Sequence, residues 1–241
     1  LMARFISSVC SYFVGGYDLG SATTQAKITL STEALDVTAF GQSAERVSTA
    51  GALRKDSIDW AGFFADGIQS PDAYLAGSLG TVGDVVTFAI GTTTGDRAYC
   101  GTVLSEKVGV GGEVRGLVRY EATWRPDNTL DRCRHMGVPL TGTTGAGMPG
   151  SIDDDAASTG TGAAYFHVLA YTGTLSNLNL VLIHSTDGTT FSTKATADFT
   201  GTGSKRTEFT GTLNRYVDTD ANFTGSVGGP TATWFIAYKR P

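Results

Sequence analysis

The sequence predicts a mostly β protein with one short helix. Of its 241 residues, 32 are glycine and 17% are charged, and threonine, serine and valine, which favour strands and turns over helices, are abundant. Apolar and polar side chains alternate in many stretches, and this period of two is typical of strands with one buried face. A single stretch combines the start and stop signals of a helix.

A long polar loop lies between two alternating stretches near the start of the chain. Residues 26–31 and 35–39 alternate in polarity, and residues 58–64 repeat the pattern, so strands are expected on both sides of the loop. The loop, residues 41–56, far exceeds the roughly two to five residues that a hairpin needs, and surplus loops are usually binding loops or disordered. Four charged residues of this loop are Glu45, Arg46, Arg54 and Lys55. They belong either to a mobile surface loop or to a binding surface.

One helix is expected at residues 70–80. Ser70 is a favourable N-cap, and Pro71 sits at the first helical position, where its missing N–H costs nothing. Asp72 complements the helix dipole and Gly80 can end the helix. A helix this short is stabilised by packing on a sheet. Further strands are expected at residues 4–14, 84–91 and 98–107.

The strand pattern is clearest in residues 113–125. Apolar residues such as Tyr120 and Trp124 share one face, and at ~3.3 Å per residue such a strand would extend about 40 Å, which suggests a wall. The opposite face has two interpretations. It is either the solvent-exposed side of an ordinary sheet, in which Glu121 pairs with the arginines, or a surface that lies at a subunit contact or faces a channel. This face carries Arg115, Arg119, Glu121 and Arg125.

Residues 127–162 show no sustained period, and glycine, threonine, serine and aspartate crowd the end of this range. We therefore expect a linker or an extended surface crossing between a first domain, residues 1–126, and a small C-terminal β domain, residues 163–241. Five alternating stretches in the last part favour a small sandwich or partial barrel. They are residues 164–171, 178–184, 191–199, 207–218 and 231–239.

The charge and cysteine content exclude some classes of protein. The formal net charge of −5 argues against a general grip on nucleic acid, which needs a surplus of lysine and arginine. Three widely spaced cysteines do not form the framework of a secreted disulfide-rich domain, which favours a reducing site of assembly. No apolar run approaches the ~20 residues of a membrane span, and no signal peptide is recognisable, so no membrane anchor is expected.

The sequence motifs contain no catalytic signature: G-x-S-x-G, the P-loop and H-E-x-x-H are all missing. Cys133 and His135 lack the second pair of ligands that zinc requires. Residues 153–155, three aspartates, lack the spacing of a calcium loop, and fit either a solvated acidic loop or carboxylates that meet a neighbour's arginine. We expect no enzyme activity, no metal and no cofactor.

Short motifs along most of the chain resemble those of the major tail tube proteins of long-tailed, siphovirus-like bacteriophages. The first half carries GYDL at residues 16–19, LDVTAFG at 35–41 and IDWAGFF at 58–64. Each motif is short, and the combination and order carry the resemblance. The second half is similar to the C-terminal portion of some of these proteins in GAAYFHV at 162–168, HSTDGTTF at 184–191 and LNRY at 213–216.

The resemblance implies a tail-tube-type β-sandwich or barrel whose subunits form rings, usually hexameric, that stack helically into a tube. Its implied partners are copies of the same chain, other tail proteins and a tape-measure protein, while viral DNA passes without specific binding. The chain would be a structural virion protein, assembled in the host bacterial cytoplasm, and the tube the conduit for genome ejection. The long loop would then stack rings, and residues 163–241 would be an exterior domain or a second tube domain.

Two alternatives remain open. Trp60, Trp124 and Trp234, together with the strands rich in glycine and threonine, also fit a carbohydrate-binding or adhesive β-sandwich protein. Exposed tryptophans in one groove would favour that class, whereas their positions on alternating faces indicate core residues. Another virion component, such as a capsid decoration protein, would share the composition but lack a long stacking loop.

Overall fold

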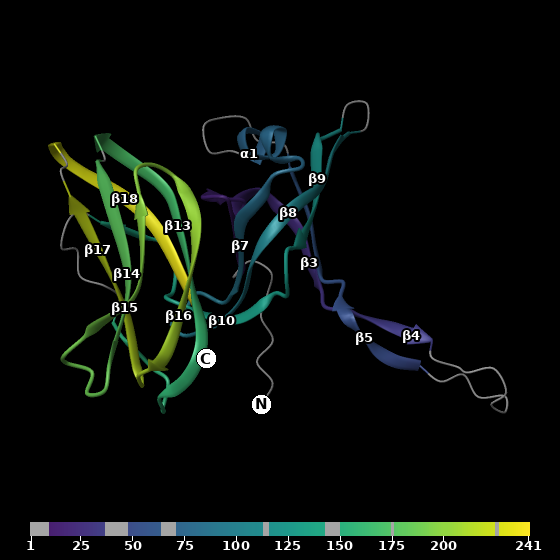
Figure 1. Ribbon diagram of the computed structural model, residues 1–241. Helices are drawn as coiled ribbons and strands as arrows, with labels where there is room; N and C mark the ends of the chain where they lie inside the picture. Colours follow the sequence, from purple (N-terminus) through teal and green to yellow (C-terminus); the bar gives the residue numbers. More distant parts are fainter. Residues whose placement is uncertain are drawn as a thin grey trace.

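The computed structural model describes residues 10–36, 48–63, 71–112, 116–142, 150–174, 176–224 and 227–241. The described chain is mostly β, as the sequence predicts, with one α-helix and three sheets (Figure 1). We refer to residues before 127 as the N-terminal half and to the rest as the C-terminal half. The N-terminal half contains β1 (Cys10–Val14), β2 (Tyr17–Asp18), the 3-10 helix η2 (Gly20–Ala22), β3 (Thr23–Thr29), β4 (Thr32–Asp36), β5 (Ser48–Arg54), β6 (Ser57–Phe63), α1 (Pro71–Ser78), β7 (Val82–Ile90), β8 (Arg97–Gly111) and β9 (Arg119–Pro126).

The N-terminal half is one strongly curved antiparallel sheet around its own core. Its strands follow the order β3-β6-β9-β8-β7-β1-β2. Trp60 and Trp124 lie at the centre of this core with their rings 6.5 Å apart. Helix α1 packs on the same core through Tyr74 and Leu75, which confirms the short helix expected here. The Tyr120 hydroxyl of β9 donates to the Asp72 carboxylate and so ties the helix to the sheet.

The C-terminal half is a β-sandwich, in agreement with the prediction. The four-stranded sheet β12-β17-β14-β15 packs on β16, β13, β18 and β11, which belong to the large sheet. Phe166, Leu180 and Trp234 are among the fully buried side chains between the two layers. The strands and their bounds are β10 (Asp131–His135), β11 (Leu140–Gly142), β12 (Ile152–Asp153), β13 (Ser158–Thr174), β14 (Asn177–Ser185), β15 (Ser192–Phe199), β16 (Gly203–Leu213), β17 (Tyr216–Thr224) and β18 (Val227–Lys239).

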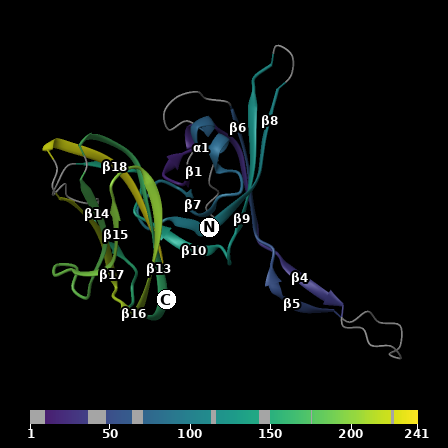
Figure 2. The ribbon, with the colours of Figure 1, turned by 45° about the horizontal axis from the view of Figure 1, so that its top comes forward.

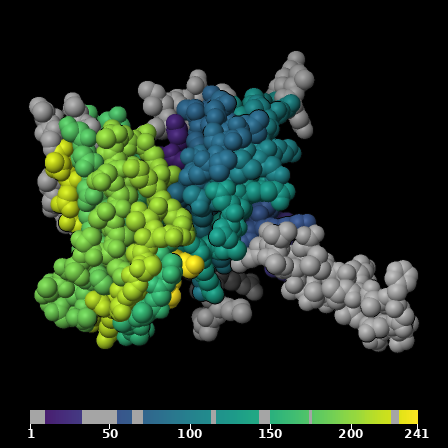
Figure 3. All heavy atoms as spheres, viewed as in Figure 1, coloured from purple at the N-terminus to yellow at the C-terminus, as the bar shows by residue number. Residues whose placement is uncertain are grey.

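Strand β10 joins the two halves into a single sheet, because it pairs with β8 on one side and with β18 on the other. The sheet folds back at this point, and a third core fills the space between β1, β7 and β8 on one side and β13 and β18 on the other. In that core the rings of Phe13 and Phe235 are 4.4 Å apart, and Thr87 Oγ1 lies 2.9 Å from His167 Nε2. The two halves therefore share a long contact, visible in Figure 3.

Strands β4 and β5 form a separate two-stranded sheet, the arm, that projects from the body in both views (Figures 1 and 2). The base of the arm is well defined. The Lys55 backbone N–H donates to the Ser31 carbonyl at 2.8 Å, and the Ser31 hydroxyl donates to the Lys55 carbonyl at 2.6 Å. The buried Asp56 carboxylate accepts from the N–H groups of Ser31 and Leu130. These bonds fix the direction in which the arm leaves the body.

Two predicted features of the N-terminal half are wrong in part. The expected loop at residues 41–56 includes strand β5, while residues 37–47 lie outside the described residues. The longest strand of this half is β8, with 15 residues, and not residues 113–125. Strand β9 begins at Arg119, opposite Gly111 at the end of β8, and residues 113–115 lie outside the described residues. Polarity alternation alone does not show where a chain turns back on itself.

The C-terminal half also differs from the expectation. The expected linker at residues 127–162 contains β10, β11, β12 and the start of β13. Strand β10 was not recognised in the sequence because the residues that it buries are not typical apolar core residues. Asp131, Cys133 and His135 face inward, while its arginines face outward. The expected strand at residues 207–218 is two strands, β16 and β17. The division into three domains stays a prediction.

Candidate assembly surfaces

The strand residues predicted to form a wall lie on the outer face of four neighbouring strands. Trp60, Ala122 and Trp124 point into the core, and their neighbours on β6 and β9 therefore point outward. We call this surface the β3–β6–β9–β8 face. Its side chains are Gln25, Lys27, Asp59, Phe63, Glu106, Lys107, Arg119, Glu121, Thr123 and Arg125.

Cross-strand register gives this face ordered rows. One row runs from Lys27 through Asp59 and Thr123 to Lys107, and the Thr123 hydroxyl donates to the Asp59 carboxylate at 3.0 Å. At the end of the sheet, the Arg119 guanidinium lies 5.9 Å from the centre of the Phe63 ring. Opposite charges thus stand side by side in fixed positions, as in a surface that can match another surface.

The structure places Arg119, Glu121 and Arg125 together on β9, and Arg115 lies outside the described residues. Arg125 Nε lies 2.6 Å from Glu106 Oε2, so its partner is Glu106 and not Glu121 as expected. Within the described residues, Arg119 and Glu121 form no ion pair. Both members of the Arg125–Glu106 pair are about half exposed, and such pairs contribute about 0–1 kcal/mol to folding. The charges on this face therefore do little for the stability of the subunit.

A group of exposed apolar side chains lies at the end of the β8–β9 hairpin, next to this face. We call it the tip patch: Phe63, Val110, Leu117 and Val118, with exposed fractions of 37%, 61%, 69% and 43%. Figure 2 shows this end of β8 standing clear of the rest of the sheet. By register, Val110 shares the inner face with Tyr120 and Phe63 shares the outer face with Arg119, so the tip patch includes both faces of this end of the sheet. Exposed apolar side chains at a protruding end are a candidate contact with another protein.

The charged residues of the predicted loop fall at the arm. Arg54 is the last residue of β5, and Lys55 follows at the base with an exposed side chain. Glu45 and Arg46 lie outside the described residues. The structure thus places only the part of this predicted segment that belongs to β5 and the base of the arm, and the role of its charged side chains stays a prediction.

The residues considered above as possible metal sites have structural roles. The described residues hold no group of three histidine, cysteine or acidic side chains that could bind a metal ion. Cys133 is buried between the halves, and the His135 Nδ1 lies 2.9 Å from the Gly137 carbonyl oxygen. Burial lowers the pKa of His135. The acidic residues at 153–155 meet arginines of the same chain: Asp153 binds Arg215 at 2.5 Å, and Asp154 binds Arg134 and Arg240.

The tryptophans do not form a binding groove. Trp60, Trp124 and Trp234 are 2%, 0% and 1% exposed, respectively, so each is a core residue. The feature that motivated a carbohydrate-binding class is thus explained by packing. In the described parts of the chain, no helix has the length and apolar character needed to cross a lipid bilayer.

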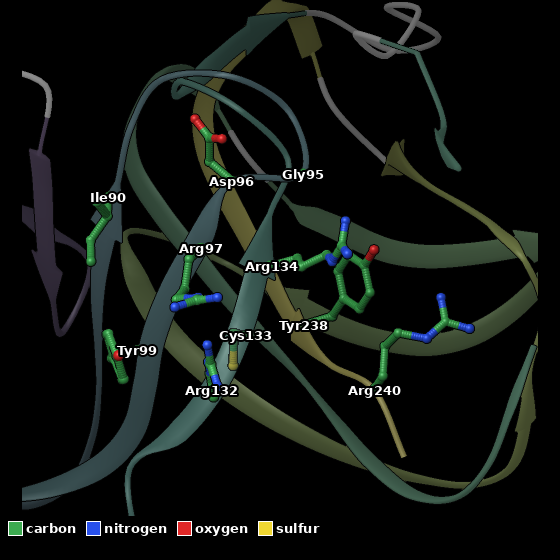
Figure 4. Close-up of a pocket in the computed structure, with 10 residues that line it drawn as sticks. All are labelled: Ile90, Gly95, Asp96, Arg97, Tyr99, Arg132, Cys133, Arg134, Tyr238 and Arg240. Atoms are coloured by element: carbon green, nitrogen blue, oxygen red, sulfur yellow. The ribbon is translucent and has the colours of Figure 1, made fainter. Parts of the chain in front are cut away.

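Sequence reasoning missed one charged surface. Where β8, β10 and β18 meet, Arg97, Tyr99, Arg132 and Arg134 line a hollow of about 670 Å³, the arginine hollow (Figure 4). The arginines of β10 alternate with buried residues, which is a strand signal in five residues. This signal was not used because residues 127–162 as a whole show no sustained period. In addition, Arg97 lies on β8, 35 residues before Arg132, and no local pattern shows that β8 pairs with β10.

Comparisons with solved structures give weak matches to chains of a gene transfer agent particle and of phage particles. No protein-family model matches this chain, and no curated protein does. A chain of the tail of an empty gene transfer agent particle with C6 symmetry is 20% identical, covering 53% of this chain and 97% of that chain, with a TM-score of 0.37. The Dit protein of SPP1, from a hub adsorption apparatus, is 16% identical, covering 95% and 99%, with a TM-score of 0.35. A chain of the phage p2 baseplate is 8% identical, covering 97% and 99%, with a TM-score of 0.34. Scores this low do not by themselves establish a common fold.

Proposed function

We propose that this chain is a structural protein of a bacteriophage tail that assembles with copies of itself into stacked rings. The observation that carries the proposal is the arm: a two-stranded sheet that leaves the body at a fixed base and pairs with no other described strand. The resemblance to tail tube proteins supplies the class of assembly, and two of its motifs include residues of the arm and of β6.

The arm supports self-assembly because a two-stranded sheet is only marginally stable by itself in water. At its base, the Ser31–Lys55 backbone pairs and the buried Asp56 carboxylate hold the arm firmly. Beyond this base, β4 and β5 pair only with each other among the described strands. A neighbouring subunit or ring that receives the arm would stabilise it.

The edge of the curved sheet supports contact within a ring. Strand β3 pairs with β6 on one side only, so its seven residues leave one edge free in the described structure. Free edges readily take up a strand of another chain. A neighbour that adds to β3 would extend the β3–β6–β9–β8 face across the subunit boundary, and the tip patch would lie near that boundary.

The role assigned to the assembly is mechanical. Rings joined edge to edge would present a continuous wall around a channel, through which the genome and, before it, a tape-measure protein pass. The net charge of −5 suits a wall that does not retain nucleic acid. In this proposal no bond is made or broken, the partners are the chain itself and other tail proteins, and the place of action is the virion.

Electron microscopy of the purified protein at high concentration tests the proposal. Long hollow filaments with regular striations are the expected result, and dispersed monomers under every condition would overturn it. Because Ser31 and Lys55 are already hydrogen-bonded neighbours, residues 32–54 can be replaced by an Asn-Gly turn without moving the body. We expect this armless variant, and one lacking residues 44–52, to fold and yet to form no long tubes.

A matched control shortens a different hairpin. Replacing residues 186–190, within the connection between β14 and β15, by Asn-Gly leaves the arm intact, so tubes should still form. Normal tube length in the armless variant would show that ring stacking does not use the arm.

A further inference from the structure

The arginine hollow is a built feature of three strands. Arg97 and Tyr99 of β8 alternate with the buried Ala98 and Cys100, so their side chains share the outer face of the sheet. Arg132 and Arg134 of β10 alternate with the buried Cys133 and lie directly opposite Tyr99 and Arg97, respectively. Figure 4 shows Arg97, Arg132, Arg134 and Arg240 among the residues that line the hollow.

The hollow carries more positive than negative charge. The buried carboxylate of Asp154 binds Arg134 Nε at 3.1 Å and also binds Arg240, while the carboxylate of Asp96 accepts from the Thr93 N–H at 3.0 Å. Within the described residues, Arg97 and Arg132 have no ion pair. Arg97 also stands opposite Arg134, and like charges in that position are unfavourable. Asp154 compensates the charge of Arg134, whereas Arg97 has no carboxylate partner among the described residues.

A surface of the opposite charge lies on the outer face of the four-stranded sheet. Val217 and Ala221 of β17 point into the sandwich, and therefore Asp218 and Asp220 point outward. Ile183 and Val181 of β14 stand directly opposite these two aspartates. We call these four residues the acidic stripe.

Within the described residues, the acidic stripe has no basic partner, although the Asn222 side-chain amide donates to the Asp220 carboxylate at 3.2 Å. The carboxylates of Asp218 and Asp220 each accept a backbone N–H at 2.8 Å, and neither forms an ion pair with a described basic side chain. The pKa of Asp218 is raised by burial and, further, by the nearby charge of Asp220. A cationic partner would therefore be stabilising here.

We propose that the arginine hollow of one subunit receives the acidic stripe of the next, with Arg97 and Arg132 binding Asp218 and Asp220. Arginine suits this contact because its planar guanidinium binds a carboxylate through two parallel hydrogen bonds. Tyr99 and Ile90 in the hollow give the partly exposed Ile183 an apolar surface to pack against, while Val181 is buried. The inference rests on the self-assembly proposed above and assigns it a specific contact.

The contact joins two different surfaces, so it can repeat head to tail from one subunit to the next. The β13 and β18 layer and the sandwich core separate the stripe from β8 and β10, which prevents the contact from forming within one chain. A head-to-tail contact of this kind generates a ring when the rotation between subunits closes. This is the arrangement that a ring of identical subunits requires.

Two charge-reversal variants test the contact. The first is Arg97→Glu with Arg132→Glu, which makes both surfaces acidic, and the second is Asp218→Arg with Asp220→Arg, which makes both basic. Sedimentation velocity at low salt should show that each variant alone assembles roughly tenfold or more weakly than the unmodified chain. An equimolar mixture should assemble as well as the unmodified chain, because each variant then supplies the surface that the other needs.

A chain with all four substitutions is the matched control, since its net charge equals that of the unmodified protein. It should assemble normally, and high salt should weaken its assembly as it does for the unmodified chain. Circular dichroism establishes that each variant is folded. Assembly of either variant alone at the unmodified level, or failure of the mixture of folded variants, would overturn the charge contact alone. An unmodified chain that never assembles would overturn the proposed function as well.

Discussion

The two halves of the chain bury comparable cores but leave different surfaces. Of the nine large hydrophobic side chains that are exposed among the described residues, seven lie in the N-terminal half and only Val138 and Tyr171 in the other. The N-terminal half also carries the arm and the free edge of β3. The C-terminal sandwich covers its apolar residues with its own two layers. The comparison indicates that the first half is stable as a fold but incomplete as a surface.

The first prediction concerns the core between the halves and has the largest expected effect. Phe13 is fully buried there, and Phe13→Ala should lower the free energy of unfolding by about 3–5 kcal/mol, because it removes a large ring and leaves a cavity. The sandwich should then unfold in a separate, later transition, which denaturant titration followed by tryptophan fluorescence can resolve.

Phe199→Ala is the control for this loss of coupling. Phe199 is 5% exposed in the sandwich core, away from the junction, so its loss should destabilise the sandwich without separating the two halves. Two outcomes would show that the halves do not depend on the shared core. One is that Phe199→Ala also unfolds in two transitions, and the other is that Phe13→Ala unfolds in a single transition at the same denaturant concentration as the unmodified chain.

The second prediction compares two glycines that both have positive φ. Gly16, at φ +87°, lies so close to the backbone of Gly203 that an added Cβ would overlap it, whereas Gly80, at φ +79°, faces open space. Gly80→Ala should lose about 1 kcal/mol from backbone strain alone. Gly16→Ala should lose roughly 1–3 kcal/mol more, because it also forces the halves apart.

Thermal denaturation of both variants measures this difference. Equal losses for Gly16→Ala and Gly80→Ala would mean that β16 moves away at little cost. The contact between Gly16 and Gly203 would then not hold the halves together.

Local patterns were sufficient where one stretch of sequence determines the result. The Pro71 start and Gly80 end predicted helix α1, and the alternation in residues 178–184 and 191–199 predicted strands β14 and β15. Local patterns failed where residues far apart in the sequence determine the structure. Strand β10 exists because β8 and β18 stand on either side of it, and Arg97 meets Arg134 only through that pairing.

The surfaces were harder to predict than the core for the same reason. The alternation of residues 113–125 correctly placed Arg119, Glu121 and Arg125 on one face, but the ion-pair partner of Arg125 is Glu106 on the neighbouring strand β8. Alternation gives the face of a side chain, and only strand register gives its neighbours.

The third prediction is a pH dependence located between the halves. Complete burial lowers the pKa of His167 to about 3, and its Nε2 lies 2.9 Å from Thr87 Oγ1 across the junction. The unfolded chain binds a proton near pH 6.5, whereas the folded chain does not until about pH 3. Stability is therefore constant above about pH 6.5 for this group and falls by about 1.4 kcal/mol per pH unit below it.

His167→Gln is the variant that isolates this effect. Its amide can keep the hydrogen bond to Thr87 but does not titrate, so the melting temperature should fall less steeply between pH 6.5 and 4 than that of the unmodified chain. Identical slopes would assign the acid sensitivity to other groups, such as the buried His135.

The fourth prediction has the smallest effect on folding and tests the comparison of surfaces directly. Leu117 of the tip patch and Val138 of the C-terminal half are 69% and 50% exposed, so Leu117→Ser and Val138→Ser should each change the free energy of unfolding by no more than about 0.5 kcal/mol. Assembly should respond differently, because only the tip patch borders the proposed subunit boundary. Light scattering at rising protein concentration should show weaker assembly for Leu117→Ser and an unchanged curve for Val138→Ser. If the two curves coincide, the exposed apolar residues of the N-terminal half are ordinary surface residues, and the incompleteness of that half resides in the arm and the β3 edge alone.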